Sequence, residues 1–448
     1  MIFRGEVENA LNPRSYYERI FELLEAHHLW FKRSIPLIAS ENVPSSAVRE
    51  AIISDFCNRY AEGWPGDRVY AGCKYLDEVE VMAMELAKKL YNADFADVRP
   101  ISGVVANLVL YTVFTEPGDH IFALPIPRGG HISAARRKFK GTAGAVRGLN
   151  VNYFAYDEEE LNIDVDRTIK RINALAKKGV KPKLALFGAS VFLFPHPIKE
   201  LADVFHSLDA VVAYDASHVA GLIAGGCFQK PFEEGVDVIS MSTHKTLPGP
   251  QHGMILSVEK YGDLIKNTTF PALVSNHHLH NVAGLAVALA EMLAFGRTYA
   301  SQIVRNAKAL AQALYERGFK VLGEKKGFTA SHTILIDVSE FGGGAPVEAK
   351  LEEASIFVNR NLLPWDVRLG RHYKNPGGMR LGVSEVTRLG MRENEMVEIA
   401  DFIKSVIIDG KDPKAIREKV AEFRRSFQRV HYCFDNALEA YEYVKLRK

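Results

Sequence analysis

The chain is poor in cysteine and has no strong charge of either sign. Its 448 residues contain four cysteines, none of them in a C-x-x-C pair. Scattered thiols in a chain this long fit a reducing compartment and argue against a structural zinc site, so we predict no bound metal. The formal net charge is +2, which gives no electrostatic reason to expect nucleic acid or an anionic membrane as a partner.

Long hydrophobic runs are also missing. The N-terminal segment carries charges at Arg4, Glu6 and Glu8 and has no apolar stretch of the kind found in secretory signals. The most apolar stretch, residues 282–295, contains Glu291 and is too short to cross a bilayer. We therefore predict a cytoplasmic protein with no membrane partner.

Hydrophobic patterning from about residue 80 onward indicates an α/β fold. The chain is 47% hydrophobic, which is enough for a large core. Apolar segments that read as buried strands alternate with helical segments such as PIKELADVFHS; the strands are HIFAL, KLALFGAS, AVVAYDAS, DVISMST and GMILSV. This alternation predicts a mainly parallel sheet, of about seven strands, covered by helices on both faces.

Segments at either end predict further units. Residues 14–32 have apolar spacing near 3.6 and predict an amphipathic helix, either an arm across a partner subunit or a helix packed on its own domain. A long helix from about residue 282 precedes a smaller α+β unit, in which FGGGAP predicts a flexible connection. We divide the chain into a helical arm (1–35), a large domain (36–290) and a small C-terminal domain (291–448).

Asp215 and Lys245 follow two successive predicted strands. They stand 30 residues apart, about one strand–helix–strand unit. Because ligands of a doubly wound sheet bind beyond the carboxyl ends of its strands, both residues should face one crevice. A lysine amine there can form a Schiff base, and a carboxylate can pair with a protonated pyridine nitrogen, as pyridoxal phosphate chemistry requires. Taken singly, each could equally be an ordinary strand-end aspartate or a surface lysine.

Three further features support a phosphate-bearing cofactor with a flat ring. Ser102 and Gly103 open an apolar helix, whose free N–H groups and dipole attract a phosphate, although Ser102 could be a plain N-cap. His131 lies in GGHIS, where its ring could lie against the cofactor or belong to an ordinary loop. His218 could bond the hydroxyl of the cofactor ring or merely cap a helix.

With these residues in place, the chain resembles the serine hydroxymethyltransferases, most of all their archaeal branch. The motifs that carry the resemblance span nearly the whole chain: LIASENVPSSAV (37–48), NRYAEGWPGDRVYAGCKYLDEVE (58–80), SGVVAN, GGHIS, YDASHVAGLIAGG, STHKT, FPALVSNHHLH (270–280), NRNLLPWD (359–366) and GGMRLGVSEVTRLGM (377–391). The resemblance implies the aspartate-aminotransferase fold (fold type I), with 36–290 as the domain that binds pyridoxal 5'-phosphate. It also implies a homodimer with shared active sites. The activity it implies is interconversion of serine and glycine, with a one-carbon unit passed to a reduced pterin such as tetrahydrofolate or a tetrahydromethanopterin-like carrier.

The resemblance also implies a role for each matching residue. Lys245 would hold the cofactor covalently, His244 would influence reaction specificity, and Glu62 of the neighbouring subunit would give or take a proton. The other implied contacts to the cofactor come from Ser102, Gly103, His131, Asp215, His218, Ser242 and, from the other subunit, Tyr60. Those to the amino acid come from Ser40, Arg380 and, from the other subunit, Tyr70. Those to the pterin come from Ile126, Gly130, His131 and Ile132. For Arg380, a guanidinium fork suits a carboxylate better than a lysine would.

The chain departs from the family pattern around the phosphate. Where the family has a Ser-Gly-Ser-Gln run, this chain has Ser102-Gly103-Val104-Val105, so one hydroxyl is lost. After the lysine come Gln251, which the archaeal branch also has, and an unusual His252. Glycines expected in the partner's phosphate loop are replaced by Ala272-Leu273.

A basic cluster follows GGHIS on the side where the pterin would bind. Its members are Arg136, Arg137, Lys138 and Lys140. The cluster predicts either a site for an anionic tail of a modified pterin or a solvated basic face.

Two other functions stay open. A pterin-independent aldolase for threonine-like or α-methyl β-hydroxy amino acids would need the same lysine, arginine and electron sink. The chain could also be a protein that binds the cofactor but no longer catalyses a reaction, which would explain the altered phosphate loops. The joint presence of all the catalytic residues argues against this alternative.

Overall fold

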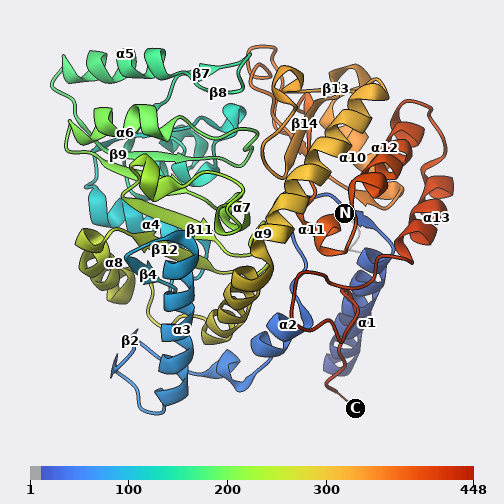
Figure 1. The fold of residues 1–448 in the computed structure, drawn as a ribbon, viewed down its shortest axis with the longest axis horizontal. Coiled ribbons are helices and arrows are strands. Elements are labelled where there is room, and N and C mark those ends of the chain that lie inside the picture. Colours follow the sequence, from blue (N-terminus) through green and yellow to red (C-terminus); the bar gives the residue numbers. More distant parts are fainter. Residues whose placement is uncertain (1–11, 448) are drawn as a thin grey trace.

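A computed structural model describes residues 12–447 as two sheets flanking a long helix (Figure 1). The larger sheet has seven strands in the order β4-β12-β11-β10-β9-β5-β6. Their bounds are β4 Phe95–Asp97, β5 His120–Ala123, β6 Asn150–Tyr153, β9 Pro182–Gly188, β10 Val211–Asp215, β11 Val238–Ser242 and β12 Gly253–Ser257. Within this sheet β12 alone runs opposite to its neighbours, so the predicted α/β fold with a mainly parallel sheet is confirmed.

Helices cover the large sheet, which is why its central strands can be apolar on both faces. Every residue of β11 and β12 is buried. The helices around the sheet are α3 (Lys74–Tyr91), α4 (Gly103–Phe114), α5 (Val165–Ala176), α6 (Ile198–His206), α7 (Ala220–Ala224) and α8 (Gly262–Thr268). Two short hairpins extend from this part, β2 (Gly63–Trp64) with β3 (Asp67–Arg68) and β7 (Tyr156–Asp157) with β8 (Asn162–Ile163).

The smaller sheet is antiparallel, with the order β13-β14-β17-β16. Its strands are β13 (Lys320–Val321), β14 (Thr333–Asp337), β16 (Asn359–Asn361) and β17 (Gly378–Gly382), accompanied by α10 (Gly344–Glu353), α11 (Ser384–Arg388), α12 (Glu393–Ile407) and α13 (Pro413–Arg424). The prediction of a flexible FGGGAP segment was wrong in its second half, because Gly344 is the first residue of α10.

The start of the large predicted domain also reaches the smaller sheet region. β1 (Ile35–Pro36) pairs with β15 (Ile356–Phe357), and α2 (Ser46–Ile52) packs on the long helix α9 (Leu279–Glu316). The three-part division of the chain stays a proposal, and its boundary at residue 290 falls inside a helix.

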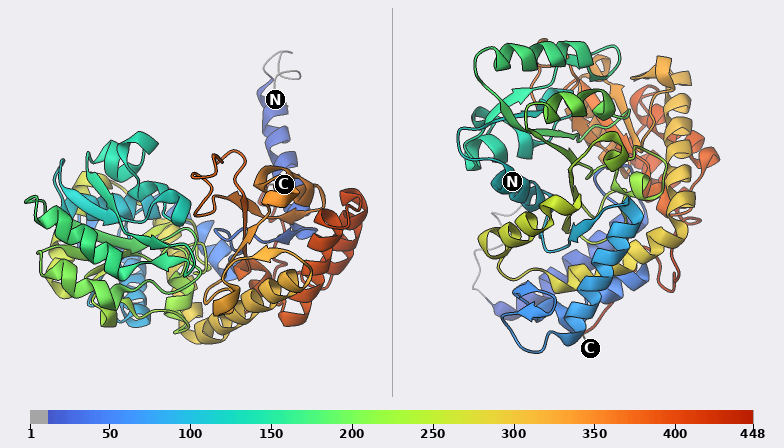
Figure 2. Two further views of the ribbon diagram at one scale, coloured as in Figure 1. Left: turned by 90° about the horizontal axis from the view of Figure 1, so that it is seen from above. Right: turned by 60° about the vertical axis from the view of Figure 1, so that its left-hand side comes forward.

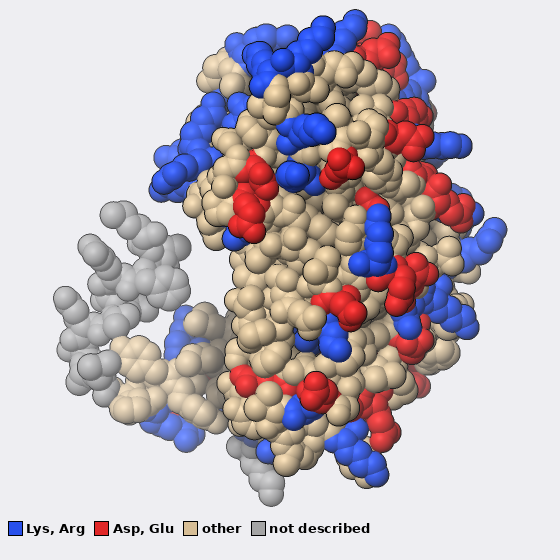
Figure 3. Space-filling model, turned by 90° about the vertical axis from the view of Figure 1, so that its left-hand side faces the viewer, with Lys and Arg blue, Asp and Glu red and all other residues tan. Residues whose placement is uncertain are grey.

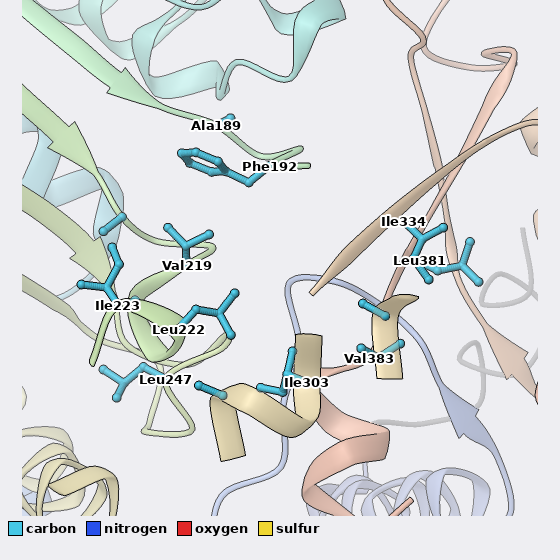
Figure 4. Close-up of a cluster of buried hydrophobic side chains, with 14 of the residues drawn as sticks. Ala189, Phe192, Val219, Leu222, Ile223, Leu247, Ile303, Ile334, Leu381 and Val383 are labelled. Atoms are coloured by element: carbon cyan, nitrogen blue, oxygen red, sulfur yellow. The ribbon is translucent and has the colours of Figure 1, made fainter. Parts of the chain in front are cut away.

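That helix, α9 (Leu279–Glu316), is 38 residues long and links the two sheets. The apolar stretch 282–295 is therefore part of a longer element than we predicted. By length and composition α9 could cross a membrane, but 61% of its most apolar window is buried inside the protein, as in the core helix of a globular protein. Figure 4 shows why: Ile303 of α9 lies between side chains of the large-sheet side, such as Leu222, and of the small sheet, such as Leu381, all fully buried.

The N-terminal helix α1 (Pro13–Lys32) has no buried residue. It begins at Asn12, whose side chain accepts a hydrogen bond from Arg14 N, and Figure 2 shows it projecting from the body of the molecule. It touches the C-terminal segment, where His28 Nδ1 lies 2.9 Å from Tyr441 O. Near its end Trp30 and Phe31 pack against Phe357, whereas much of its apolar surface is exposed, including Tyr16, Ile20 and Leu23.

Candidate active site

A cavity of about 500 Å³ lies between the two sheets, beyond the carboxyl ends of β9, β10 and β11. Thirteen of the predicted site residues line it: Ser40, Ser102, Gly103, Ile126, Gly130, His131, Ile132, Asp215, His218, Ser242, His244, Lys245 and Arg380. Residues that follow the parallel strands meet at this cavity because the carboxyl ends of parallel strands lie at the same edge of a sheet.

The Asp215 carboxylate is held from two sides. Asn107 Nδ2 donates to Asp215 Oδ2 at 2.8 Å, and Ser217 N donates to Asp215 Oδ1 at 3.0 Å. The amide oxygen of Asn107 accepts from Ser240 Oγ at 2.5 Å, which fixes which way the amide points. Asp215 therefore presents one fixed orientation to the cavity.

His131 is tied into the same network. Asn107 Nδ2 also donates to Ser133 Oγ at 3.0 Å, and Ser133 Oγ lies 2.8 Å from His131 Nδ1. Ser133 N donates to the same Nδ1 at 3.2 Å. Nδ1 therefore acts as an acceptor, and the remaining N–H of a neutral ring sits on Nε2. Burial lowers the pKa of His131, which favours this neutral form.

Lys245 is buried beside Ser242, whose Oγ accepts from Lys245 Nζ. Its main-chain oxygen accepts from Asn42 Nδ2 at 2.6 Å, so the turn after β11 is fixed as well. Burial is the main cause that lowers the pKa of Lys245 to about 8; nearby Asp215 opposes the shift and Arg380 adds to it. A large share of this amine is neutral near pH 8, as a nucleophilic lysine requires.

The turn at Ser102 has the shape of an anion site. Ser102 is the N-cap of α4, and its Oγ accepts from Val105 N at 3.2 Å. A Cβ on Gly103 would lie 3.1 Å from Ser242 N and 3.3 Å from Ser217 Oγ, so glycine keeps this corner open. The N–H groups at the start of α4, together with serine hydroxyls, suit phosphate oxygens, and Val104 lines the cavity where the family has a hydroxyl.

Arg380 lies on β17 of the small sheet and faces the cavity. Its Nε donates to Asn359 Oδ1 at 2.9 Å and its Nη1 donates to Ser190 O at 2.6 Å. Burial lowers its pKa to about 10, which leaves it charged at neutral pH. Within residues 12–447 no carboxylate pairs with it, so the guanidinium can accept a carboxylate from a ligand.

Two other histidines, the half-buried His244 and the buried His218, face the cavity in neutral form. Burial lowers the pKa of His244 to about 4, with a smaller contribution from the charge of Lys245. Burial also holds the pKa of His218 well below its usual range. His218 Nδ1 lies 3.4 Å from His332 Nε2, which in turn lies 3.1 Å from Ala39 O.

Tyr60, Glu62 and Tyr70 do not line the cavity of their own chain. Tyr60 and Tyr70 pack against each other with ring centroids 4.8 Å apart, and both are exposed. Ala61 N donates to Asn276 Oδ1 at 2.9 Å, and Ser275 Oγ donates to Glu62 Oε1. These residues lie on an outer loop, which agrees with the prediction that they serve a neighbouring subunit without testing it.

Several cavity residues were missed by the sequence analysis. The most consequential are Asn107 and Ser217, which position Asp215, and Ser190, which positions Arg380. Others are Arg360, Asn361 and Tyr373. Asn107 could have been found, since it stands about one and a half turns after Ser102 in a helix that is otherwise apolar.

Comparison with known proteins decides the family. A family model described as serine hydroxymethyltransferase matches residues 14–403. The chain belongs to the serine hydroxymethyltransferase family. It is 59% identical to the serine hydroxymethyltransferase of Nitrosopumilus maritimus, over 96% of this chain and 98% of that protein. It is 51% identical to that of Methanopyrus kandleri, over 95% and 97%.

A solved structure supports the same fold. L-threonine transaldolase from Pseudomonas fluorescens, in its internal aldimine state, has a TM-score of 0.82 and 28% identity and covers 95% of each chain. The serine hydroxymethyltransferase family uses pyridoxal phosphate, so the predicted family, fold type and cofactor are confirmed.

The residues present fit pyridoxal phosphate. The open corner at Gly103 and the start of α4 would hold the phosphate, the oriented Asp215 would face the pyridine nitrogen, and Lys245 would bind the aldehyde carbon. His131 would lie along the ring.

The lowered pKa of Lys245 predicts how fast the apoenzyme takes up the cofactor. Because the neutral amine attacks, the rate of uptake should rise with pH and level off above about pH 8, not near the ordinary lysine value of 10.5. Stopped-flow absorbance of pyridoxal phosphate measures this rate. In Arg380→Gln the midpoint should move upward, because a charge that lowers the pKa is gone. A wild-type rate that still climbs beyond pH 10 would contradict a buried amine.

Proposed function

We propose that this protein is a serine hydroxymethyltransferase that reversibly converts serine and a reduced pterin into glycine and the one-carbon-loaded pterin. The observation that carries the proposal is the convergence of Lys245, Asp215 and Arg380 on one cavity between the sheets. The first two suit a pyridoxal cofactor, and the third suits the carboxylate of an amino acid.

The reaction breaks the Cα–Cβ bond of serine. When bound, pyridoxal phosphate supplies the electron sink that accepts the bonding pair. The serine hydroxyl loses its proton as the one-carbon unit leaves as formaldehyde, and Cα gains a proton to give glycine. Asp215, held by Asn107 and Ser217, would keep a proton on the pyridine nitrogen of the bound cofactor and so strengthen its electron sink.

Substrate orientation comes from the small sheet. Arg380 binds the amino-acid carboxylate, with its plane set by Asn359 and Ser190. Ser40 lies nearby on the cavity wall. His244 lines the same cavity and stays neutral, because burial and the charge of Lys245 both lower its pKa.

Glu62 moves the proton of the serine hydroxyl from the neighbouring subunit, together with Tyr60 near the phosphate and Tyr70 near the substrate. We therefore propose a homodimer with shared active sites. Two features support it: these three residues lie outside the cavity of their own chain, and α1 exposes an apolar surface that a partner would cover. We also propose a cytoplasmic location.

The pterin lies at Ile126, Gly130, His131 and Ile132, which line one wall of the cavity. A Cβ on Gly130 would lie 2.0 Å from Leu124 O, so only glycine fits there. Next to this wall, Arg137, Lys138 and Lys140 are exposed and receive the anionic tail of the carrier. Arg136 has another task, since its Nε donates to Val151 O at 2.8 Å and its guanidinium lies over the Tyr153 ring.

Figure 3 shows Lys and Arg side chains gathered toward the upper part of one face of the molecule, while its other parts carry mixed charge. A local excess of basic side chains favours an anionic ligand even though the net charge of the chain is small.

A second candidate function is pterin-independent cleavage of threonine-like β-hydroxy amino acids. The shared fold with an L-threonine transaldolase favours it as a side activity of the same cavity.

Product analysis separates the two functions. With labelled serine, wild-type protein should form glycine rapidly only when a reduced pterin is present, because the pterin removes the formaldehyde. Assays across several tetrahydropterins identify the carrier. Lys245→Ala should abolish the reaction in every case. Equal rates with and without pterin would favour the aldolase.

Shared active sites predict complementation. Glu62→Gln should lower kcat by about 100-fold, and Lys245→Ala should be inactive. A doubly tagged heterodimer of the two variants contains one cavity with both an intact lysine and an intact glutamate, so it should recover about half of the wild-type activity per dimer. No recovery would show that Glu62 does not act in the neighbouring subunit.

The basic cluster predicts a selective change in pterin affinity. The double variant Arg137→Gln/Lys138→Gln should raise the KM for the pterin about threefold to tenfold, and high salt should reduce the difference. Pterin-independent cleavage should not change. Lys177→Gln/Lys178→Gln, which removes two exposed charges at the end of α5, is the matched control. Equal KM values in both variants would reject the proposed tail site.

A further inference from the structure

We propose that Arg68 is a positioning residue for Glu62, because it binds the main-chain carbonyls on both sides of it. Arg68 Nη1 donates to Ala61 O at 2.8 Å and to Gly63 O at 3.1 Å. One buried guanidinium thus spans the residue that we propose as the proton carrier; the inference rests on that proposed function. We call Arg68 and its partners the arginine clamp.

The guanidinium is fixed by two carboxylates of α3, the half-buried Asp77 and the buried Glu80. Arg68 Nε donates to Asp77 Oδ1 at 2.8 Å, and Nη2 donates to Glu80 Oε2 at 2.7 Å. The Arg68 side chain is 3% exposed and that of Glu80 is fully buried. His277 Nε2 lies 2.7 Å from the same Glu80 oxygen and donates to it, since a carboxylate only accepts. The planar fork therefore has one allowed orientation.

A second buried arginine holds the same carbonyl. Arg99 Nη1 donates to Gly63 O at 3.1 Å, and its guanidinium lies 4.7 Å from the centre of the Trp64 ring. Arg99 pairs with Asp97 at 2.7 Å, and both side chains are almost completely buried. Two independent cations thus converge on the residue that follows Glu62.

The local backbone explains why such support is needed. Gly63 has a φ of +104°, and a Cβ there would lie 2.4 Å from Asp67 O, so the chain turns sharply just after Glu62. The hairpin that follows has strands of only two residues each, too short to be stable by itself. Asp77 Oδ2 also accepts from Gly66 N at 2.8 Å, which fixes the tip of the hairpin to the clamp.

The Glu62 side chain has little support of its own. Among residues 12–447, its carboxylate is hydrogen-bonded only to the Ser275 hydroxyl. The place of the carboxylate therefore depends on the main chain, which the arginine clamp holds. The desolvation of a buried ion pair largely offsets the attraction between its charges, so such a pair adds little to the stability of the fold. We therefore attribute to Arg68 a role in positioning the main chain.

Arg68→Lys tests the inference, because lysine keeps the charge but cannot reach both carbonyls and both carboxylates at once. We expect kcat for serine cleavage to fall about 10- to 100-fold, with KM for serine within about twofold of wild type. The visible spectrum of the bound cofactor should stay unchanged, because Arg68 binds main-chain carbonyls and α3 carboxylates and contacts no residue that lines the cavity. Hydrogen exchange should speed up at residues 61–70 and stay the same at residues 103–114.

Arg317→Lys is the matched control. Arg317 also uses its fork on a carboxylate, Asp401, at 2.8 and 2.9 Å, and on a carbonyl, Ala313 O, at 2.9 Å. It lies at the end of α9, far along the chain from both the cavity and Glu62. The kcat of Arg317→Lys should equal that of wild type. A loss of activity in Arg68→Lys can then be assigned to position 68 and not to the replacement of a bidentate arginine as such.

Heterodimers distinguish positioning from a folding defect. A doubly tagged dimer of Arg68→Lys with Lys245→Ala contains one cavity with an intact lysine and the wild-type loop of its partner, so it should recover about half of the wild-type activity per dimer. If Arg68→Lys is inactive because its own chain is damaged, no activity returns, and the inference is overturned. A kcat for Arg68→Lys equal to that of wild type overturns it as well.

The outcome separates this inference from the proposed function. If the Glu62→Gln heterodimer recovers activity but the Arg68→Lys heterodimer does not, Glu62 acts across the interface and the role of Arg68 is refuted. If neither recovers, the shared site itself is refuted, and the inference falls with it.

Discussion

One side-chain amide holds the cavity together. Asn107 uses both of its N–H groups and its oxygen, and so links α4 to Asp215, to Ser133 and to Ser240. These partners come from the strands β10 and β11 and from the segment that carries His131. Because α4 also begins at the phosphate turn, a shift of this helix would move the phosphate site and the carboxylate together. The buried amide is fully satisfied, which is the condition under which a polar network makes a core rigid.

Around this network the cavity is mostly neutral. The histidine rings are buried or half-buried and stay uncharged, and the amine of Lys245 loses part of its charge near neutral pH. Two permanent charges lie deepest in it, the carboxylate of Asp215 and the guanidinium of Arg380, one on each sheet, while Arg360 at the wall is paired with Glu348. In a site of low polarity these charges orient a ligand strongly, since little water competes with them.

The large sheet and several of the cavity residues could be predicted from the sequence. Apolar strands such as KLALFGAS indicate a covered parallel sheet, and polar residues that follow such strands must meet at its edge. For this reason Asp215 and Lys245 were expected to share one cavity, and the fold brings them together there. Gly103 was predictable because a glycine at a helix start has few other reasons to occur.

Other features depend on contacts that a linear pattern does not record. The reversed direction of β12 leaves no trace in its apolar composition. Gly344 starts a helix although its neighbours are glycines, because its N–H bonds to Pro376 O, which lies far along the chain. The arginine clamp joins residues separated by more than two hundred positions, from Arg68 to His277, and each member alone looks like an ordinary surface charge or loop histidine. Ser190 contributes only a carbonyl, and a carbonyl is present at every position.

The continuity of α9 has a mechanical consequence. A single rod of 38 residues runs from beside His277 to the edge of the small sheet, with Gly296 packed closely on Gly225 midway along it. If the small sheet tilts so that the cavity narrows, α9 must either bend or move at its N-terminal end, the end away from the small sheet. The start of α9 adjoins the loop of Glu62 through His277 and Glu80, so closure around a substrate would displace the loop that we propose to serve a neighbouring subunit.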